Sequence, residues 1–363
     1  MPAPLRVLTI DGGGMRGVYP AAFLHGLADQ FAKDRGVDGL DIGKAFDIIV
    51  GTSTGAIIAC ALAKGVPMLK VVELYKEHGP KIFPQKLANG VGVLKQIPTR
   101  KHHLRKGAKA LENALRGVLE DETFGSLYAR RGIGLAIPAV EMAQQRSWVF
   151  KTSHWGGHRD DDVTLVDACM ATSAAPIYRS LSSIDADDDL DGYRVFADGG
   201  LWANNPALVG LMEALKIDAR TPEEKTRPIE IYSVGTLPCP QGGPIPKAKL
   251  ARGIVGWKFG GEAASLSIAA QETAFDHIVG FLAEEFTSLG RQVETHRFPR
   301  GVLQPSRMPY LDLDDTSDEA RNALLDQARE DVNVARMAAS TKNDPTGQAI
   351  NSLFMMMPER TED

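Results

Sequence analysis

The chain has 363 residues, of which 44% are hydrophobic and 24% are charged. This composition is typical of a globular protein with a sizeable core, as one large α/β domain with insertions or as two smaller domains. The 46 acidic and 41 basic residues leave a net charge of −5, which provides no general attraction for DNA or RNA.

The cysteines and the hydropathy of the chain indicate the compartment of the protein and its relation to the membrane. Cys60, Cys169 and Cys239 stand singly, without CxxC or CxxH spacing, so we expect buried free thiols, no disulfide framework and no zinc site. The apolar run at residues 5–10 is too short for a signal peptide, and no run has membrane-spanning length. We therefore expect a cytoplasmic, non-integral protein.

The predicted elements alternate between strands and helices. A buried strand at residues 5–10 leads through a glycine-rich turn into a helix with one apolar face, and a strand at 46–50 leads through a second turn into a helix at 56–64. This alternation predicts a three-layer α/β/α fold with a central, mostly parallel sheet covered on both faces. Further strands are predicted at 134–140, 148–151, 193–197 and 229–234, and further helices at 104–119 and 206–215.

Two segments depart from this pattern. Between residues 65 and 107 prolines and glycines loosen it, which is typical of a lid or insertion. From residue 317 the chain is polar and helix-prone, with Ser317 as a plausible helix cap, and residues 353–357 form an apolar patch expected to pack on the domain. We therefore divide the chain into a main α/β domain at 1–316, containing the lid or insertion at 65–107, and a C-terminal helical extension and tail at 317–363.

The first chemical motif is Gly51-Thr52-Ser53-Thr54-Gly55, placed between a strand and a helix. A serine nucleophile must project from a sharp strand-to-helix turn, which the small flanking residues Gly51 and Gly55 permit. The helix N-terminus also favours the negative charge that develops during acyl transfer. A GxSxG pattern can arise by chance in a chain this long, so the motif alone does not indicate a catalytic serine. The strand before it and the helix after it support that interpretation.

The second motif is the run Asp11-Gly12-Gly13-Gly14-Met15-Arg16-Gly17. Its consecutive amides can form an oxyanion hole, with Arg16 adding positive charge. A dinucleotide-binding turn is the rival, but that fold needs a strand ending in an acidic residue about 20 positions on. Residues 33–39 are instead polar and broken by glycine, so an oxidoreductase of this kind is a remote alternative.

The third motif, Asp198-Gly199-Gly200, follows a predicted strand, where an aspartate can reach a neighbouring loop. Together, in this order, the three motifs resemble the patatin-like phospholipase family, as do Ala171–Pro176 before the aspartate and Leu201–Pro206 after it. The resemblance covers roughly residues 5–240. It implies a patatin-like fold and a serine lipid acyl hydrolase of the phospholipase A type, with Ser53 as nucleophile and Asp198 as base.

The implied reaction needs no cofactor and no metal. A free aspartate is a weak base, so Asp198 must be partly desolvated to take the Ser53 proton. Oxyanion stabilisation is assigned to residues Gly12, Gly13, Gly14, Met15, Arg16 and Gly17, while Gly51, Gly55, Gly199 and Gly200 support the motifs. None of the eight histidines sits where a triad requires it, although a histidine triad stays open as the mechanistic alternative.

The opening Ile10-Asp11-Gly12-Gly13-Gly14 also resembles bacterial patatin-like effectors of cyclic-nucleotide anti-phage defence (CBASS). That resemblance implies membrane phospholipids as substrate at the inner membrane surface, a cyclic dinucleotide as activator, and a homo-oligomer. The alternative is a constitutive housekeeping lipase, esterase or thioesterase. One basic cluster, at residues 95–106, suits lipid headgroups or a nucleotide, or is a solvated face; the acidic run at 185–191 lacks the pattern of a calcium loop.

Overall fold

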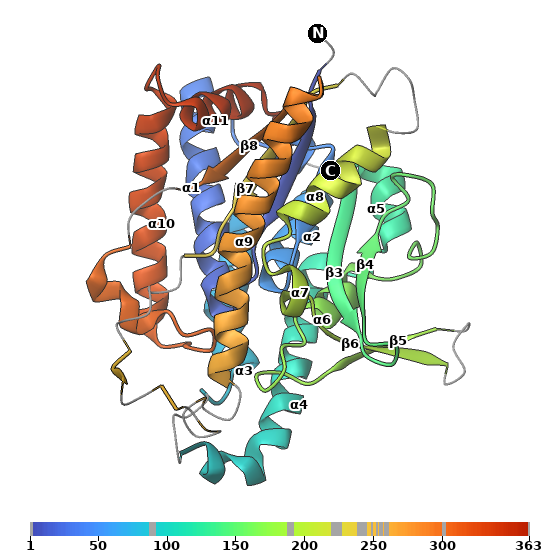
Figure 1. Ribbon diagram of the computed structural model, residues 1–363, viewed down its shortest axis with the longest axis vertical. Coiled ribbons are helices and arrows are strands. Elements are labelled where there is room, and N and C mark those ends of the chain that lie inside the picture. Colours follow the sequence, from blue (N-terminus) through green and yellow to red (C-terminus); the bar gives the residue numbers. More distant parts are fainter. Residues whose placement is uncertain are drawn as a thin grey trace.

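The computed structural model describes residues 3–86, 92–186, 192–218, 227–237, 245–247, 250, 251, 253, 257, 261–299 and 303–361. These residues form a central sheet with helices on both faces (Figure 1). Cys239 and residues 187–191 of the acidic run lie outside the described residues.

The described strands form one eight-stranded sheet in the order β5-β6-β3-β2-β1-β7-β8, with β4 paired to β3 as a branch. Five neighbouring strands, from β8 to β3, pair in parallel, while β4, β5 and β6 join by antiparallel pairing. The predicted mostly parallel sheet is confirmed. The strands are β1 (Leu5–Ile10), β2 (Ile48–Gly51), β3 (Gly134–Glu141), β4 (Arg146–Lys151), β5 (Ser182–Asp185), β6 (Tyr193–Asp198), β7 (Ile229–Val234) and β8 (Val293–Phe298).

Helices cover both faces of the sheet, as the three-layer prediction requires. One face packs against α1, α2 and α6, with α10 and α11 behind α1; the other packs against α8 and α9 (Figure 1). The helices are α1 (Val18–Arg35), α2 (Thr54–Lys64), α3 (Met68–Ile82), α4 (Gly92–Leu119), α5 (Phe124–Arg131), α6 (Leu165–Thr172), α7 (Gly200–Ala203), α8 (Ala207–Asp218), α9 (Gly261–Ser288), α10 (Asp318–Ala339) and α11 (Pro345–Met356).

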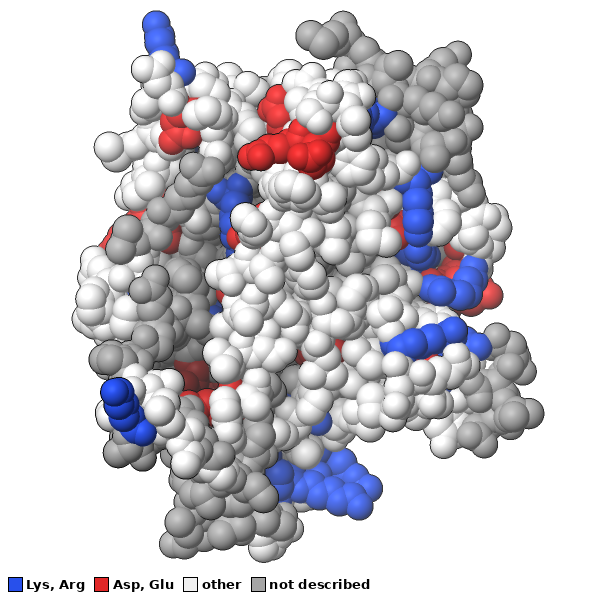
Figure 2. Space-filling model, in the orientation of Figure 1, with Lys and Arg blue, Asp and Glu red and all other residues white. Residues whose placement is uncertain are grey.

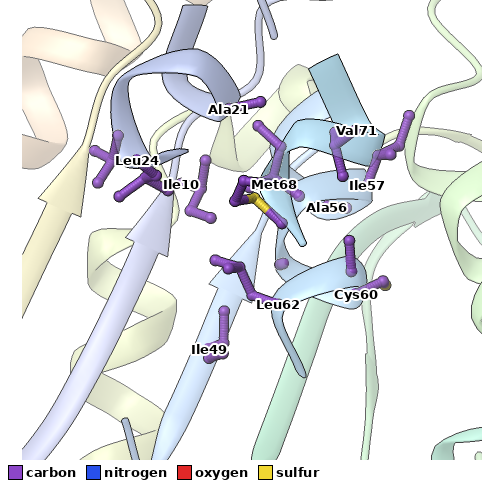
Figure 3. Packing of buried hydrophobic residues seen from close by; sticks show 14 of the residues in the cluster. Ile10, Ala21, Leu24, Ile49, Ala56, Ile57, Cys60, Leu62, Met68 and Val71 are labelled. Atoms are coloured by element: carbon purple, nitrogen blue, oxygen red, sulfur yellow. The ribbon is translucent and has the colours of Figure 1, made fainter. Parts of the chain in front are cut away.

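Successive side chains of the central strands point to opposite faces of the sheet, so they contribute to two separate hydrophobic clusters. In β2, Ile49 belongs to the cluster under α1 and α2, while Ile48 and Val50 belong to the cluster under α8 and α9. Figure 3 shows Ile49 and Leu62 on the first of these faces. Because both faces of a mostly parallel sheet are buried, its strands are apolar throughout, which is why β1 and β2 could be predicted from sequence.

One edge of β3 brings two strand ends together. Residues 134–136 of β3 pair with β2 in parallel, whereas residues 139–141 pair with β6 antiparallel, and β4 pairs along 136–141. Since β4 takes the other edge, β2 and β6 share one edge and run toward each other. Their carboxyl ends therefore meet, and the loops that follow carry Ser53 and Asp198.

The strands β5 and β8 and the helices α3, α5, α6, α7 and α9 were not among the predicted elements. β5 and β8 are short and polar, with sequences SSID and VETHRF. Helix α3 lies in the segment where prolines and glycines loosen the sequence pattern. Pro67 stands at its N-cap and Pro80 in its last turn, so neither proline interrupts the middle of the helix. The segment 65–107 is thus largely helical, formed by α3 and the first half of α4, with residues 87–91 outside the description.

The C-terminal region is helical, as expected. The Ser317 hydroxyl accepts a hydrogen bond from the Ala320 amide and caps α10, as predicted. Leu353, Phe354 and Met357 are buried, and Phe354 stacks on Phe31 of α1, so most of the apolar patch packs on the domain. Among the described residues, no helix has the length and apolar character needed to cross a membrane.

The basic cluster lies on α4. Figure 2 shows lysine and arginine side chains gathered at the lower edge of the molecule, where Figure 1 places this helix. Lys101, Arg105 and Lys106 are exposed, whereas the Arg100 guanidinium donates to the carbonyl oxygens of Ile177 and Gln85. Arg100 therefore makes contacts within the protein, while Lys101, Arg105 and Lys106 are exposed and remain candidates for lipid headgroups or a nucleotide.

Candidate active site

Ser53 stands at the turn between β2 and α2 in a conformation that side chains rarely adopt. Its φ of 53° and ψ of −122° lie outside the common regions for an L-residue, which costs of the order of 1–3 kcal/mol. The side chain remains only 8% exposed. The sequence prediction of a sharp strand-to-helix turn at this serine is thus met in the backbone.

The two glycines of this turn are required by close backbone approach. A Cβ on Gly51 would lie 2.4 Å from the Gly55 carbonyl oxygen, and a Cβ on Gly55 would lie 2.3 Å from that of Ile10. Both distances are far below van der Waals contact, so no larger residue fits either position without displacing β1 or α2. The chain can therefore turn sharply enough to present Ser53.

Asp198 accepts a hydrogen bond from the Ser53 hydroxyl, with 2.8 Å between Oγ and Oδ2, across 145 positions of sequence. Its other oxygen, Oδ1, accepts from the Gly200 amide at 2.7 Å. Burial raises the pKa of Asp198 to about 6, although the Gly200 amide, the Ser53 hydroxyl and the Arg179 charge all act to lower it. The expected desolvation is present, with Asp198 only 6% exposed.

Thr172, the last residue of α6, fills the gap between the ends of β2 and β6. Its hydroxyl donates to the Pro138 carbonyl oxygen at 2.5 Å and accepts from the Ser53 amide at 2.9 Å. Its own carbonyl oxygen accepts from the Gly199 amide at 3.1 Å. One residue thereby joins the β3 edge, the serine turn and the aspartate turn.

The glycine-rich loop lies beside Ser53, but most of its amides are already engaged. The amides of Gly12, Gly13, Met15 and Arg16 donate to the Asn204 carbonyl, the Thr54 hydroxyl, the Leu313 carbonyl and the Gly13 carbonyl, respectively. Gly13 and Gly14 line the cavity that contains Ser53. Gly14 has a φ of +57°, and a Cβ there would lie 2.3 Å from the Leu313 carbonyl oxygen. Of the two loop residues that line the cavity, Gly14 therefore has the amide that no described residue engages.

The charged residues of this loop, Asp11 and Arg16, are not among the residues that line the cavity around Ser53. The Arg16 guanidinium is 1% exposed and donates to the Leu237 carbonyl oxygen, so it supports the loop from behind. Asp11 is fully buried and pairs with Arg297 of β8, which also binds Asp276 of α9. Burial raises the pKa of Asp11, while the Arg297 charge opposes that shift. Gly17 lies deeper still, packed against Tyr75.

Two asparagines after the aspartate turn tie the site to α9. Asn204 lines the cavity and donates to Glu272 at 3.0 Å, and Asn205 donates to Asp276 at 2.6 Å. Burial raises the pKa of Glu272 to about 7, and the nearby Arg16 charge acts against that shift. These carboxylates were not predicted from sequence, because nothing in the local pattern of α9 distinguishes them from solvated charges.

The cavity around Ser53 and Asp198 is mostly apolar. None of the described residues that line it is a histidine, and Ser53 Oγ bonds to a carboxylate instead. The buried His154 ring bonds to Thr152 and Glu213, away from this cavity. The cavity walls come from the glycine loop, α2, α3, α4, the loop after α6 and the aspartate turn, through residues that include Ile57, Tyr75, Phe83, Leu111, Pro176 and Leu201.

Two of the three cysteines lie next to each other on the helices α2 and α6. Cys60 of α2 and Cys169 of α6 are buried free thiols, 3.6 Å apart, as expected for two of the three cysteines. No cluster of ligands suited to a metal ion occurs among the described residues. The sequence reasoning passed over Arg179, which lines the cavity near Asp198, because the charge follows the Ala171–Pro176 stretch without a recognisable motif.

Comparison with known proteins agrees with this architecture. Residues 8–211 match the family model described as patatin-like phospholipase. The chain is 35% identical to a protein of Vibrio cholerae named cGAMP-activated phospholipase, over 64% of this chain and 64% of that protein. It is 32% identical to proteins of the same name from Pseudomonas aeruginosa, over 75% of this chain and 74% of that protein, and from Escherichia coli, over 64% and 62%.

A parallel sheet with a serine elbow facing an aspartate turn defines a serine-hydrolase type of α/β protein. More particularly, the chain belongs to the patatin-like phospholipase family. The matched segments span 62% to 74% of the length of these three relatives.

The three-way contact of Thr172 leads to a stability prediction. Thr172→Val removes the hydroxyl and leaves the Pro138 carbonyl and the Ser53 amide buried without partners, so we expect the free energy of unfolding to fall by about 2–4 kcal/mol. Thr172→Ser keeps the hydroxyl and is the matched control, with an expected loss nearer to about 1 kcal/mol. Urea denaturation of both variants measures the difference, and equal stabilities would contradict this role for the hydroxyl.

Proposed function

We propose that this protein is a serine lipid acyl hydrolase of the phospholipase A type, using Ser53 and Asp198 as a catalytic dyad. The observation that carries the proposal is the Ser53–Asp198 hydrogen bond of 2.8 Å inside an apolar cavity edged by the glycine loop. The family membership supports an ester of a lipid as the substrate.

The reaction follows from the positions of these groups. As Ser53 Oγ attacks the ester carbonyl carbon, its proton passes to Asp198 Oδ2, and the carbonyl oxygen becomes an oxyanion beside the Gly14 amide and the N-terminus of α2. The tetrahedral intermediate collapses, and the leaving alcohol takes the proton from Asp198. Water then attacks the acyl-serine while Asp198 accepts its proton; collapse returns that proton to Ser53 and releases the fatty acid.

Asp198 suits this role because of its surroundings. A carboxylate with a pKa of about 6 is a stronger base than a solvated aspartate and is still mostly ionised at neutral pH. The cavity walls supply room for an acyl chain next to the nucleophile. The substrate is proposed to be membrane phospholipid, met at the inner membrane surface by a protein without a spanning segment in its described part.

Removing either member of the dyad should separate activity from folding. Ser53→Ala and Asp198→Asn should each lower the hydrolysis of a fluorogenic lipid ester by at least about 10³-fold. Because the asparagine side chain carries no charge to desolvate, Asp198→Asn should also raise the free energy of unfolding at pH 8, by about 1–3 kcal/mol. That gain should shrink as the pH falls through about 6, where the wild-type carboxyl becomes protonated in the folded state. Retained turnover in Asp198→Asn would refute the dyad.

The raised pKa of Asp198 also predicts the pH dependence of activity. The base works only when ionised, so kcat/KM for an uncharged ester should rise with pH through a midpoint at about 6 and then level off. The uncharged substrate removes titration of the substrate as an explanation. A midpoint close to that of a solvated aspartate, about 4, would show that Asp198 is not desolvated in solution, and a midpoint above about 7 would favour a histidine base.

We propose further that a cyclic dinucleotide activates this hydrolysis, as part of an anti-phage response. The support is that three similar bacterial proteins are each named cGAMP-activated phospholipase. The competing proposal is a constitutive housekeeping lipase or thioesterase, which needs no activator. The oligomeric state is proposed to be a homo-oligomer.

Release of fatty acid from mixed phospholipid vesicles distinguishes these proposals. The wild-type chain is assayed with and without each member of a panel of cyclic dinucleotides, and Ser53→Ala provides the blank. We expect release to increase at least about tenfold with one member of the panel. Equal release with and without every nucleotide would support the constitutive enzyme.

A further inference from the structure

Arg179 carries a buried charge that has no partner among the described residues of the active-site cavity. It is 8% exposed and lines the cavity together with Ser53 and Asp198. Its Nε is buried, and no described residue accepts a hydrogen bond from its guanidinium. Burying a charge without a partner is strongly unfavourable, so its presence calls for an explanation.

Two guanidinium groups elsewhere among the described residues are paired with carboxylates. Arg131 binds both carboxylate oxygens of Asp41 at 2.8 Å, and Arg297 binds Asp11 and Asp276. Arg179 differs because Asp198, the carboxylate whose charge influences it, forms no ion pair with it. Asp198 already accepts from Ser53 and Gly200. Apart from the buried Nε, the donors of Arg179 are therefore available to a ligand in the cavity.

A strained turn holds Arg179 in this position. Ile177, two residues earlier, has a φ of 74°, which is an outlier for a β-branched residue. Arg100 of α4 donates to the Ile177 carbonyl oxygen at 2.9 Å, and the Arg179 amide donates to the Ala175 carbonyl oxygen at 2.8 Å. The cost of this conformation is offset by contacts that fix the turn, so the backbone that carries Arg179 is held in place.

Arg179 remains a cation under ordinary conditions. Burial lowers its pKa to about 10, against the opposing influence of Asp198 and Tyr75, so the group is charged at neutral pH. Around it the cavity is apolar, formed by side chains such as Ile57, Leu111 and Phe83. A ligand that fits must therefore combine an apolar chain with one anionic group close to the atom that Ser53 attacks.

Glycerophospholipids have this combination, because the phosphodiester and the acyl esters are attached to the same glycerol. We propose that Arg179 is a specificity-determining residue that binds the phosphodiester of a glycerophospholipid while its ester lies at Ser53. The proposal rests on the hydrolase function proposed above. It gives the site a physical reason to prefer phospholipids over neutral glycerides, since a guanidinium forms strong charge-assisted hydrogen bonds with phosphate oxygens.

The test compares two substrates with identical acyl chains, dihexanoyl-phosphatidylcholine and the uncharged dihexanoylglycerol, with the activating cyclic dinucleotide present where the wild-type chain requires it. Arg179→Met removes the charge and keeps most of the side-chain volume. We expect it to lower kcat/KM for the phospholipid by about 30-fold or more and for dihexanoylglycerol by less than about threefold. Arg179→Lys should recover part of the phospholipid activity, and Arg329→Met, at an exposed position on α10, should change neither.

Two kinetic outcomes overturn the proposal. Equal losses on both substrates would place Arg179 at the oxyanion or make it a positioning group for Asp198, and a shared shift in the pH midpoint would identify the second case. Unchanged activity on both substrates would make the charge irrelevant to the reaction. If Arg179→Met does not fold, as judged by thermal unfolding, Arg179→Gln replaces it in the same comparison.

A binding measurement separates this proposal from the proposed chemistry. Calorimetry on the Ser53→Ala protein should show dihexanoyl-phosphatidylcholine binding at least about tenfold tighter than dihexanoylglycerol, and Arg179→Met in that background should abolish the difference. Inorganic phosphate in excess should compete weakly, because it lacks the acyl chains. If the activity tests refute the Ser53–Asp198 dyad while the difference in affinity persists, the lipid-binding role of Arg179 is supported and the proposed chemistry is not. If the two lipids bind equally while hydrolysis still depends on Ser53 and Asp198, only the proposed phosphate contact is refuted.

Discussion

The site depends on one edge of β3, where two strands pair end to end. β2 and β6 run toward each other along this edge, and their carboxyl ends lie only a few residues of β3 apart. Backbone pairing fixes both strands to the same partner, so the positions of Ser53 and Asp198 are set by hydrogen-bond register and not by flexible loops. Pro138, opposite the gap, has no amide to offer, and its carbonyl is satisfied by Thr172. The same threonine then holds the Ser53 amide, which joins the register of the sheet to the strained serine turn.

The pKa of Asp198 is set by two opposing influences. The proposed role as a base requires the carboxylate to lose enough water to gain basicity and yet to stay ionised at neutral pH. Burial acts in the first direction, while the Gly200 amide, the Ser53 hydroxyl and the more distant Arg179 charge act in the second. Arg179 lines the same cavity, and its charge favours the ionised form of Asp198. Removing water from this cavity, as an acyl chain would on binding, strengthens both influences.

The sequence predicted the parts of this structure whose signals are local. β1 and β2 are apolar runs bounded by glycine turns, and the three motifs follow them closely, so the fold class and the Ser53–Asp198 pairing could both be inferred. Helix α3 was missed because Pro80 and Gly79 suggest a break that in fact falls in its last turn. β8 was missed because its polar residues, including Arg297, face partners far away in the sequence. The role of Thr172 and the isolation of Arg179 depend on tertiary neighbours, which no local pattern records.

The anchoring of the dyad on β3 has a consequence for how such a chain can vary. After α2 the chain folds through α3, α4 and α5 and returns to the sheet only at Gly134, whose pairing with Ile48 restores the register. Insertions or deletions at the α3–α4 junction would leave Ser53 and Asp198 in place, while Phe83 and Leu111, on either side of that junction, would shift and reshape the cavity. If Ser53 and Asp198 act as proposed, the residues that carry out the chemistry and part of the cavity wall therefore lie in separate stretches of sequence. A change in the length of the α3–α4 segment would then alter that wall and leave Ser53 and Asp198 unchanged.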